Sequence, residues 1–162
     1  MTTDVREGHP PAFDEHCRRE TGNELQATLS ELIDLSLIGK QLHWNIVGRP
    51  FKPLHEHLDE LVDAWRELSD TVAERAVALD IAPDGQAGSV CANSGIEPVD
   101  AGALDTDAAT RELIARLAIV AERTRARMNR LGEFDLASQD VLVEVVRSLE
   151  KQLWMLRASL PR

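Results

Sequence analysis

Histidine and acidic residues recur along one stretch of the sequence at the spacing of a helical turn. His55 is followed four residues later by Asp59, and Asp70 is followed four residues later by Glu74. Residues four apart lie on one face of an α-helix, so each pair could hold a cation between its two side chains. Imidazole and carboxylate ligands without thiolate suit iron, zinc or manganese, and open coordination positions permit redox chemistry. The spacing therefore predicts two halves of a metal site.

The two pairs cannot share one ion within a single helix. From residue 55 to residue 70 is fifteen residues, which is roughly 22 Å along a helix. Either the pairs form two separate sites, or other elements complete each of them. If two copies of this helix met antiparallel across a two-fold axis near residues 64 and 65, the His55/Asp59 pair of one copy would face the Asp70/Glu74 pair of the other.

Histidine is confined to the first part of the sequence, since none follows His57. The later helices therefore lack the Glu-x-x-His motif of bundles that hold a di-iron centre within one chain. His43 is the natural additional ligand, because the turn that follows it would bring it beside the start of the next helix.

Four long helical patterns position these residues. We expect helices over about 23–47, 53–79, 107–131 and from 136 or 138 to 159, with Asn23 capping the first and Gly132 closing the third. Residues 80–105 are rich in glycine and proline and long enough to cross the bundle, with one short extra helix. Two short links and one long crossover predict an all-α, ferritin-like four-helix bundle. Residues 1–20 are expected to form an N-terminal arm, and residues 21–162 the bundle.

The apolar positions indicate which helix faces are buried. Helix 23–47 is apolar on more than one side, which suggests a second contact with another subunit. Helix 53–79 carries one apolar stripe at steps of three and four, and this stripe is the predicted core: Leu54, Leu58, Leu61, Trp65, Leu68, Val72, Ala76 and Leu79.

Composition limits the class of protein. The chain has 162 residues, of which 43% are hydrophobic, enough for one domain with a core. Its 28 acidic and 18 basic residues give a net charge of −10, which disfavours nucleic acid and anionic membranes as partners. Two cysteines make no disulfide framework, and no apolar stretch is long enough to span a membrane. We therefore expect a cytoplasmic protein.

Four blocks of the sequence resemble the Dps family of miniature ferritins, named for a DNA-binding protein from starved cells. The blocks are K-x-x-H-W-N-x-x-G at 40–48, L-H-x-x-L-D-E at 54–60, D-x-x-A-E-R at 70–75 and E-K-x-x-W-M-L at 150–156. They stand in the family's order and spacing, and the resemblance covers about residues 23–160. Each block alone is moderately specific, whereas the combination is highly specific.

The resemblance implies a ferroxidase centre at a two-fold interface, with two iron ions in each centre. One subunit would supply His43, His55 and Asp59, and its partner would supply Asp70 and Glu74. This assignment agrees with the two-fold arrangement inferred from the spacing. The family forms hollow shells of twelve subunits that oxidise Fe(II), usually with hydrogen peroxide rather than dioxygen, and store the ferric product.

The resemblance also implies roles for residues outside the centre. Trp44 would lie near the iron and trap stray oxidising equivalents. Acidic side chains facing the lumen would nucleate the ferric mineral, and others would line three-fold pores. The nucleation residues are Glu56, Glu60 and Asp63, and the pore residues are Asp135, Asp140 and Glu144.

Simpler interpretations compete with these roles. An acidic stripe on a helix is often only a solvated face, and acids near position 135 would favour a helix start in any protein. His57 is expected at the surface, and Trp65, Trp154 and in part Trp44 are expected to pack. Arm residues that could hold an accessory metal are better explained as a solvated tail: His9, Asp14, Glu15, His16 and Cys17.

Two other functions compete with the ferroxidase. A nucleoid protein that binds DNA directly would need a lysine-rich terminal tail, whereas residues 1–20 hold three basic and five acidic side chains. Weak or no DNA binding is therefore expected, although association with the nucleoid stays open. A non-catalytic scaffold would make His43 and Asp59 dispensable.

Overall fold

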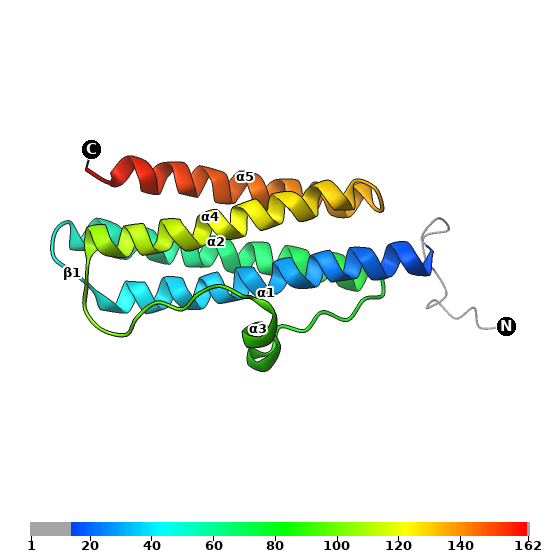
Figure 1. Cartoon of the computed structure of the whole chain (residues 1–162), viewed down its shortest axis with the longest axis horizontal. Coiled ribbons are helices and arrows are strands. Elements are labelled where there is room, and N and C mark those ends of the chain that lie inside the picture. The colour runs from blue at the N-terminus through cyan, green and yellow to red at the C-terminus, as the bar shows by residue number, and fades with distance from the viewer. Residues whose placement is uncertain (1–13, 162) are drawn as a thin grey trace.

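Four long helices lie alongside one another in the computed structural model, which describes residues 14–161 (Figure 1). Two hairpins with short turns pair α1 with α2 and α4 with α5, and these pairs make the most extensive contacts. Within the described residues, no helix is long and apolar enough to cross a membrane. The expected four-helix bundle is confirmed, and its long helices are α1 (Glu15–Asn45), α2 (Phe51–Ala78), α4 (Thr106–Leu131) and α5 (Leu136–Ser159).

The long crossover between the hairpins runs along the outside of α1 (Figure 1). It contains the short helix α3 (Ala87–Asn93), as expected, and α3 packs against α1. The crossover ends in β2 (Leu104–Asp105), which pairs in parallel with β1 (Ile46–Val47). Two-residue strands are too short for a pattern of alternating side chains, so the sequence did not predict this pairing. The pairing ties the end of the crossover to the α1–α2 turn.

The first helix begins earlier in the chain than expected. Its N-cap is Asp14, whose carboxylate accepts a hydrogen bond from the backbone N–H of Cys17 at 2.7 Å. Asn23 lies inside the helix, so the predicted start there is wrong. The buried Gly22 packs against Ile81, and this tertiary contact keeps the helix continuous despite the low helix propensity of glycine. Residues 15–20 of the expected arm are thus helical, and residues 1–13 lie outside the described part of the chain.

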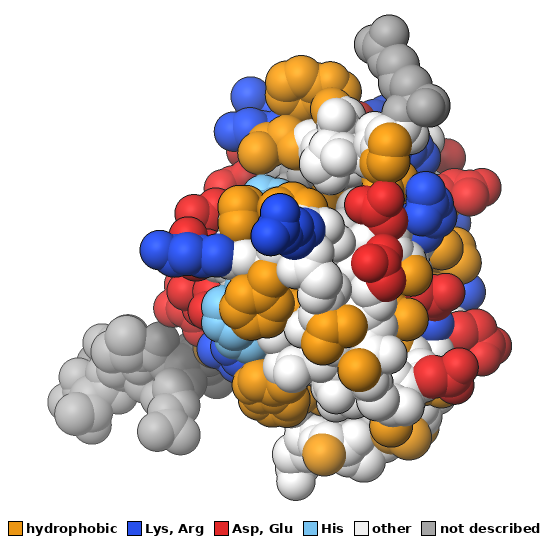
Figure 2. Space-filling view, turned by 90° about the vertical axis from the view of Figure 1, so that its left-hand side faces the viewer, with side chains coloured by type: hydrophobic (Ala, Val, Ile, Leu, Met, Phe, Trp, Pro, Cys, Tyr) orange, Lys and Arg blue, Asp and Glu red, His pale blue; other side chains and the backbone are white. Residues whose placement is uncertain are grey.

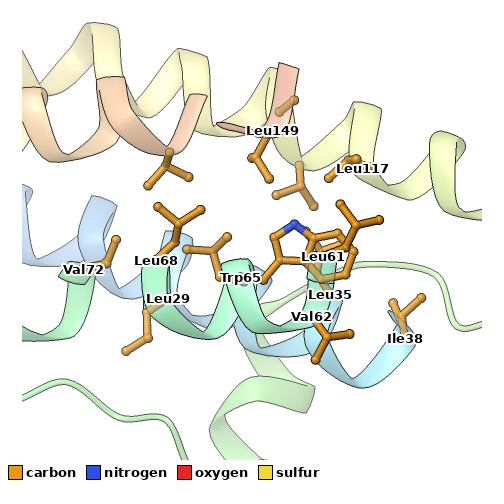
Figure 3. Close-up of a cluster of buried hydrophobic side chains, with 14 of the residues drawn as sticks. Leu29, Leu35, Ile38, Leu61, Val62, Trp65, Leu68, Val72, Leu117 and Leu149 are labelled. Carbon is orange, nitrogen blue, oxygen red and sulfur yellow. The ribbon is translucent and has the colours of Figure 1, made fainter. Parts of the chain in front are cut away.

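Trp65 lies in the middle of the hydrophobic core (Figure 3). Its side chain is fully buried, and its indole N–H donates a hydrogen bond to Gln152 on α5 at 2.8 Å. On α1, a Cβ at Gly39 would lie only 2.6 Å from Val62 and 2.8 Å from Trp65, so glycine permits this close helix approach. The predicted apolar stripe of α2 is buried, with Leu54 half-buried at its start.

Charged side chains join α1 to α4. The buried Glu31 accepts hydrogen bonds from Arg127 and, at 3.0 Å, from Arg123. Arg123 also donates to the carbonyls of Ser94 and Gly95 at 3.3 Å each, which fixes the middle of the crossover. The crossover is therefore held to α4 at Ser94 and Gly95, next to the helix α3 that packs against α1.

Candidate metal centre

His43, His55 and Asp59 converge near the α1–α2 turn. One ligand atom of each residue lies within 4.8 Å of the other two. His43 comes from the last turn of α1, whereas His55 and Asp59 stand one turn apart near the start of α2. In residues 14–161 these are the only three such ligands that come together in this way. The fold therefore assembles half of the predicted site within one chain.

Each imidazole of this triad is oriented by the backbone of the other residue. The two rings stack with centroids 3.6 Å apart and an interplanar angle of 24°. His43 Nδ1 donates to the carbonyl oxygen of His55 at 3.0 Å, and His55 Nδ1 donates to that of His43 at 3.2 Å. A proton on Nδ1 leaves the lone pair on Nε2, so both Nε2 atoms are available to a metal ion.

A lysine forms an ion pair with the carboxylate of the triad. Lys40 Nζ lies 2.6 Å from Asp59 Oδ1, which is also 3.4 Å from His43 Nδ1. The Lys40 hydrogen bond outweighs the effect of burial and, with the nearby imidazoles, lowers the pKa of Asp59 below its usual value. The Asp59 side chain is 47% exposed whereas that of His43 is 8% exposed, so a cation can approach from the Asp59 side.

Exposed hydrophobic side chains lie beside the triad. Figure 2 faces the end of the molecule that holds the α1–α2 turn, and it shows histidine side chains next to hydrophobic ones, with basic and acidic side chains nearby. Trp44 is 69% exposed and Phe51 is 43% exposed. Lys40 Nζ lies 6.0 Å from the centroid of the Trp44 ring. Trp44 is therefore mostly exposed, and the remaining third of its surface is the partial packing that was expected.

The other half of the predicted site stands apart from the triad. Asp70 and Glu74 are exposed on α2, and within residues 14–161 neither side chain has a hydrogen bond or an ion pair. They project one helical turn apart from the same face. A single chain therefore presents the two halves separately, as the helix length requires.

The sequence and the fold of the chain are similar to those of known proteins. The chain matches the family model described as a ferritin-like domain over residues 22–162. It is 33% identical to a DNA protection during starvation protein of Mycolicibacterium smegmatis, over 93% of this chain and 82% of that protein. A structure titled as the Mycobacterium smegmatis Dps superposes with a TM-score of 0.91 at 32% identity, over 96% of this chain and 95% of that one.

The chain belongs to the Dps family of ferritin-like proteins. Membership implies iron storage and protection of DNA as its broad function. A further relative, named the fine tangled pili major subunit of Haemophilus ducreyi, is 35% identical over 84% of this chain and 72% of that protein. The two relatives carry different names at similar identity, so the finer function of this chain depends on its own site.

The acids expected to nucleate mineral in this Dps protein are exposed on α2. Each lies near one basic side chain on the same helix: Glu56 is 3.4 Å from Lys52, Glu60 is 3.3 Å from His57, and Asp63 is 3.8 Å from Arg66. Such exposed pairs open easily. These acids are therefore accessible to cations, and their part in nucleation stays a prediction.

The three acids expected at a pore have different surroundings. Asp135 is the N-cap of α5 and pairs with Arg75 at 2.6 Å. Burial tends to raise the pKa of Asp135, but hydrogen bonds from Ser138 and Arg75 outweigh burial and lower it. Asp140 and Glu144 are exposed and line a surface hollow of about 560 Å³ together with Arg147 and Lys151. Their role at a pore stays a prediction.

The side chains bear on several other expectations. Trp154 is 67% exposed, so the expectation that it packs is wrong within the single chain, whereas Trp65 is buried as expected. The side chain of His57 is only 25% exposed and lines a cavity of about 290 Å³. His16 lies edge-on to Phe134, with ring centroids 5.8 Å apart. His9, the remaining histidine of the expected arm, lies outside the described residues.

Sequence reasoning missed two neighbours of the triad. Lys40 holds the carboxylate of Asp59, and Phe51 stacks on His55. Both stand within one helical turn of a predicted ligand, Lys40 before His43 and Phe51 before His55. That spacing was the available signal, because residues three or four apart meet on a helix face.

Proposed function

We propose that this Dps protein is a ferroxidase and iron store that works between two subunits of a twelve-subunit cage. It would oxidise Fe(II) with hydrogen peroxide or dioxygen and retain the ferric product. The observation that carries this proposal is the assembled triad of His43, His55 and Asp59. Two imidazole nitrogens and one carboxylate suit Fe(II), and three ligands from one chain leave coordination positions open.

The second subunit would complete the centre. Asp70 and Glu74 are exposed and have no partner within residues 14–161. Two α2 helices meeting antiparallel near residues 64 and 65 would place these acids opposite the partner's triad, so that one isologous pair carries two equivalent centres. Exposed apolar side chains on α1, with Leu37 at 57%, support a contact of this kind.

The chemistry follows from two Fe(II) ions bound close together. Each ion gives one electron to the same hydrogen peroxide, the O–O bond breaks, and two protons are taken up to leave two molecules of water. This two-electron reduction avoids the hydroxyl radical. Carboxylate ligands favour the harder Fe(III) and help to drive the oxidation. Trp44, whose ring centroid is 6.0 Å from Lys40 Nζ, would give an electron to oxidants that escape from the centre.

Protection of DNA is chemical in this proposal, because both iron and peroxide are consumed. The net charge of −10 disfavours direct binding to nucleic acid. In the described chain, basic side chains such as Arg125 and Arg130 pair with acids. We expect no retardation of plasmid DNA in a gel at physiological salt, and a clear shift there would contradict this part of the proposal.

The first test is an anaerobic titration of the metal-free protein with Fe(II), followed by hydrogen peroxide and, separately, air. Ferric absorbance and the iron retained by the protein are both recorded. We expect fast oxidation by peroxide, with about two Fe(II) consumed per peroxide. Oxidation no faster than in buffer, with iron precipitating outside the protein, would contradict the ferroxidase.

A complementation experiment tests whether the centre lies between subunits. One variant carries His43→Ala and Asp59→Ala, and the other carries Asp70→Asn and Glu74→Gln. Each alone has no complete centre, but a mixed pair has one. Random pairing makes about half of the pairs mixed and restores about a quarter of the activity.

The matched control mixes the His43→Ala, Asp59→Ala variant with a His55→Ala variant. Both defects then lie in the same half of the centre, so no pairing restores a complete one. Activity in the first mixture that does not exceed this control would show that the two halves do not meet between subunits.

A further inference from the structure

An aromatic ring covers the side of His55 that His43 leaves open. Phe51 stacks on His55 with ring centroids 5.0 Å apart and an interplanar angle of 26°. His43 stacks on the same imidazole at 3.6 Å and 24°. Two nearly parallel rings cannot share one face of a third ring at these distances without overlap, so the His55 ring is held between them.

The start of α2 sets this arrangement. Phe51 is the first residue of the helix, and Phe51, His55 and Asp59 follow one another at intervals of four, which places them on one face. Phe51 is 43% exposed and does not belong to the core cluster. Its ring is therefore not needed to fill the interior of the bundle.

We propose that Phe51 is a positioning residue for the metal centre and keeps the His55 imidazole directed at the ion. The inference rests on the proposed function of the triad. His55 has one hydrogen bond from its ring, between Nδ1 and the His43 carbonyl at 3.2 Å, and the ring could pivot about that bond. Stacking on both faces removes this freedom before a metal arrives, so less rotational freedom is lost when it binds.

The exposed side of Phe51 would also suit a contact with a second subunit, and the experiment must separate the two roles. His43, His55 and Asp59 all come from one chain. A variant with Asp70→Asn and Glu74→Gln keeps this triad and removes the partner's ligands. Adding a Phe51 substitution to that variant tests whether the ring affects metal binding by the triad alone, whether or not the subunits pair.

Co(II) is the probe, because its visible absorption band reports the geometry of its ligands without oxidation. In the Asp70→Asn, Glu74→Gln background, Phe51→Leu should weaken Co(II) binding by about threefold to tenfold and change the shape of the band. Phe51→Tyr, which keeps the ring, should leave both unchanged. Val77→Ala, at the other end of α2 and 59% exposed, controls for the loss of exposed apolar surface.

Two results would overturn the inference. In one, Phe51→Leu binds Co(II) with the affinity and band of its parent. In the other, Phe51→Leu weakens binding in the natural sequence but not in the Asp70→Asn, Glu74→Gln background, which assigns the effect to subunit contact. Failure of the proposed function differs from both, since the unsubstituted protein would then not bind Co(II), or His55→Ala would not weaken binding.

Discussion

The carboxylates of Glu31 on α1 and Asp59 on α2 both pair with basic side chains, yet their environments differ. Glu31 is 1% exposed, and each of its oxygens accepts from a different arginine, Arg123 or Arg127. The Asp59 side chain is 47% exposed and pairs with Lys40 through Oδ1. The first carboxylate is enclosed by fixed partners, whereas the second can exchange its cation for another. Burial thus separates a carboxylate that holds the fold from one that can bind a ligand.

This difference predicts opposite consequences for substitution. Removing one partner of a buried ion pair leaves a charge without a counterion inside the protein and is strongly destabilising. An exposed pair contributes little to stability, because water solvates both charges once they separate. Changes at Glu31 should therefore act on the free energy of unfolding, and changes at Asp59 on metal affinity.

The largest effect on metal affinity is expected at the triad. Asp59→Asn removes the anionic ligand and should weaken Co(II) binding by at least about a hundredfold, since even residues that only orient ligands cost up to that amount. The free energy of unfolding should change by less than about 0.5 kcal/mol. Co(II) titration and urea unfolding measure the two quantities.

Asp63→Asn is the matched control for this substitution. Asp63 lies one turn further along α2, with its side chain 74% exposed, and is not part of the triad. Its neutralisation lowers the negative charge of the helix by the same amount. An equal loss of Co(II) affinity in both variants would mean that general charge, rather than coordination by Asp59, attracts the ion.

Glu31→Ala should destabilise the bundle by up to about 3–5 kcal/mol, because the buried Arg127 would keep only the more distant Glu24, at 4.0 Å, as its counterion. Urea unfolding would measure this loss. Co(II) affinity should stay unchanged below the unfolding transition, since the triad lies at the α1–α2 turn. A variant as stable as the natural protein would show that the Glu31 network opens to water and would remove the contrast with Asp59.

Helical periodicity predicted the two functional faces of α2. Trp65 is buried and the His55/Asp59 pair reaches the surface, because both positions follow from the geometry of one helix. His43 could be placed as well, since a short turn leaves few ways to arrange two consecutive helices. The second half of the site could only be assigned to another copy, and its pairing remains a proposal.

What the sequence did not predict depends on contacts between distant segments. Gly22 packs against Ile81, and α1 is continuous through the position where it was expected to begin. Ile46 pairs with Leu104 in a sheet of two-residue strands. The buried Glu31 meets arginines from α4. Residue spacing within one helix holds no information about such distant pairs. The spacing of four residues between Phe51 and His55, in contrast, could have indicated that their rings meet.

Lys40→Met changes the partner of Asp59 and leaves its carboxylate in place. Lys40 and a bound cation compete for the same carboxylate, so removal of Lys40 should strengthen Co(II) binding by about twofold to fivefold, in line with the modest strength of ion pairs that water reaches. Lys40→Arg keeps the charge and should not strengthen binding. A weaker Co(II) affinity of Lys40→Met in the same titration would show that Lys40 orients Asp59 instead of competing with the metal.

In its exposure, Asp135 lies between Glu31 and Asp59. Its side chain is 13% exposed and is paired with Arg75 at 2.6 Å. Burial opposes its charge, but hydrogen bonds from Ser138 and Arg75 lower the pKa of Asp135. A carboxyl group whose pKa is lowered by folding stabilises the protein above its unfolded pKa of about 3.9. That contribution is lost as the pH falls through the folded pKa.

Asp135→Asn keeps a helix cap and removes the charge, so it should cost about 0.5–1 kcal/mol at neutral pH. The difference from the natural protein should shrink as urea unfolding is repeated toward pH 3. Asp140→Asn, at an exposed position of the same helix, should show no such trend. If Asp135→Asn leaves the free energy of unfolding unchanged at neutral pH, the ion pair with Arg75 does not stabilise the fold. Asp135 would then resemble Asp59, as an acid that can bind another cation.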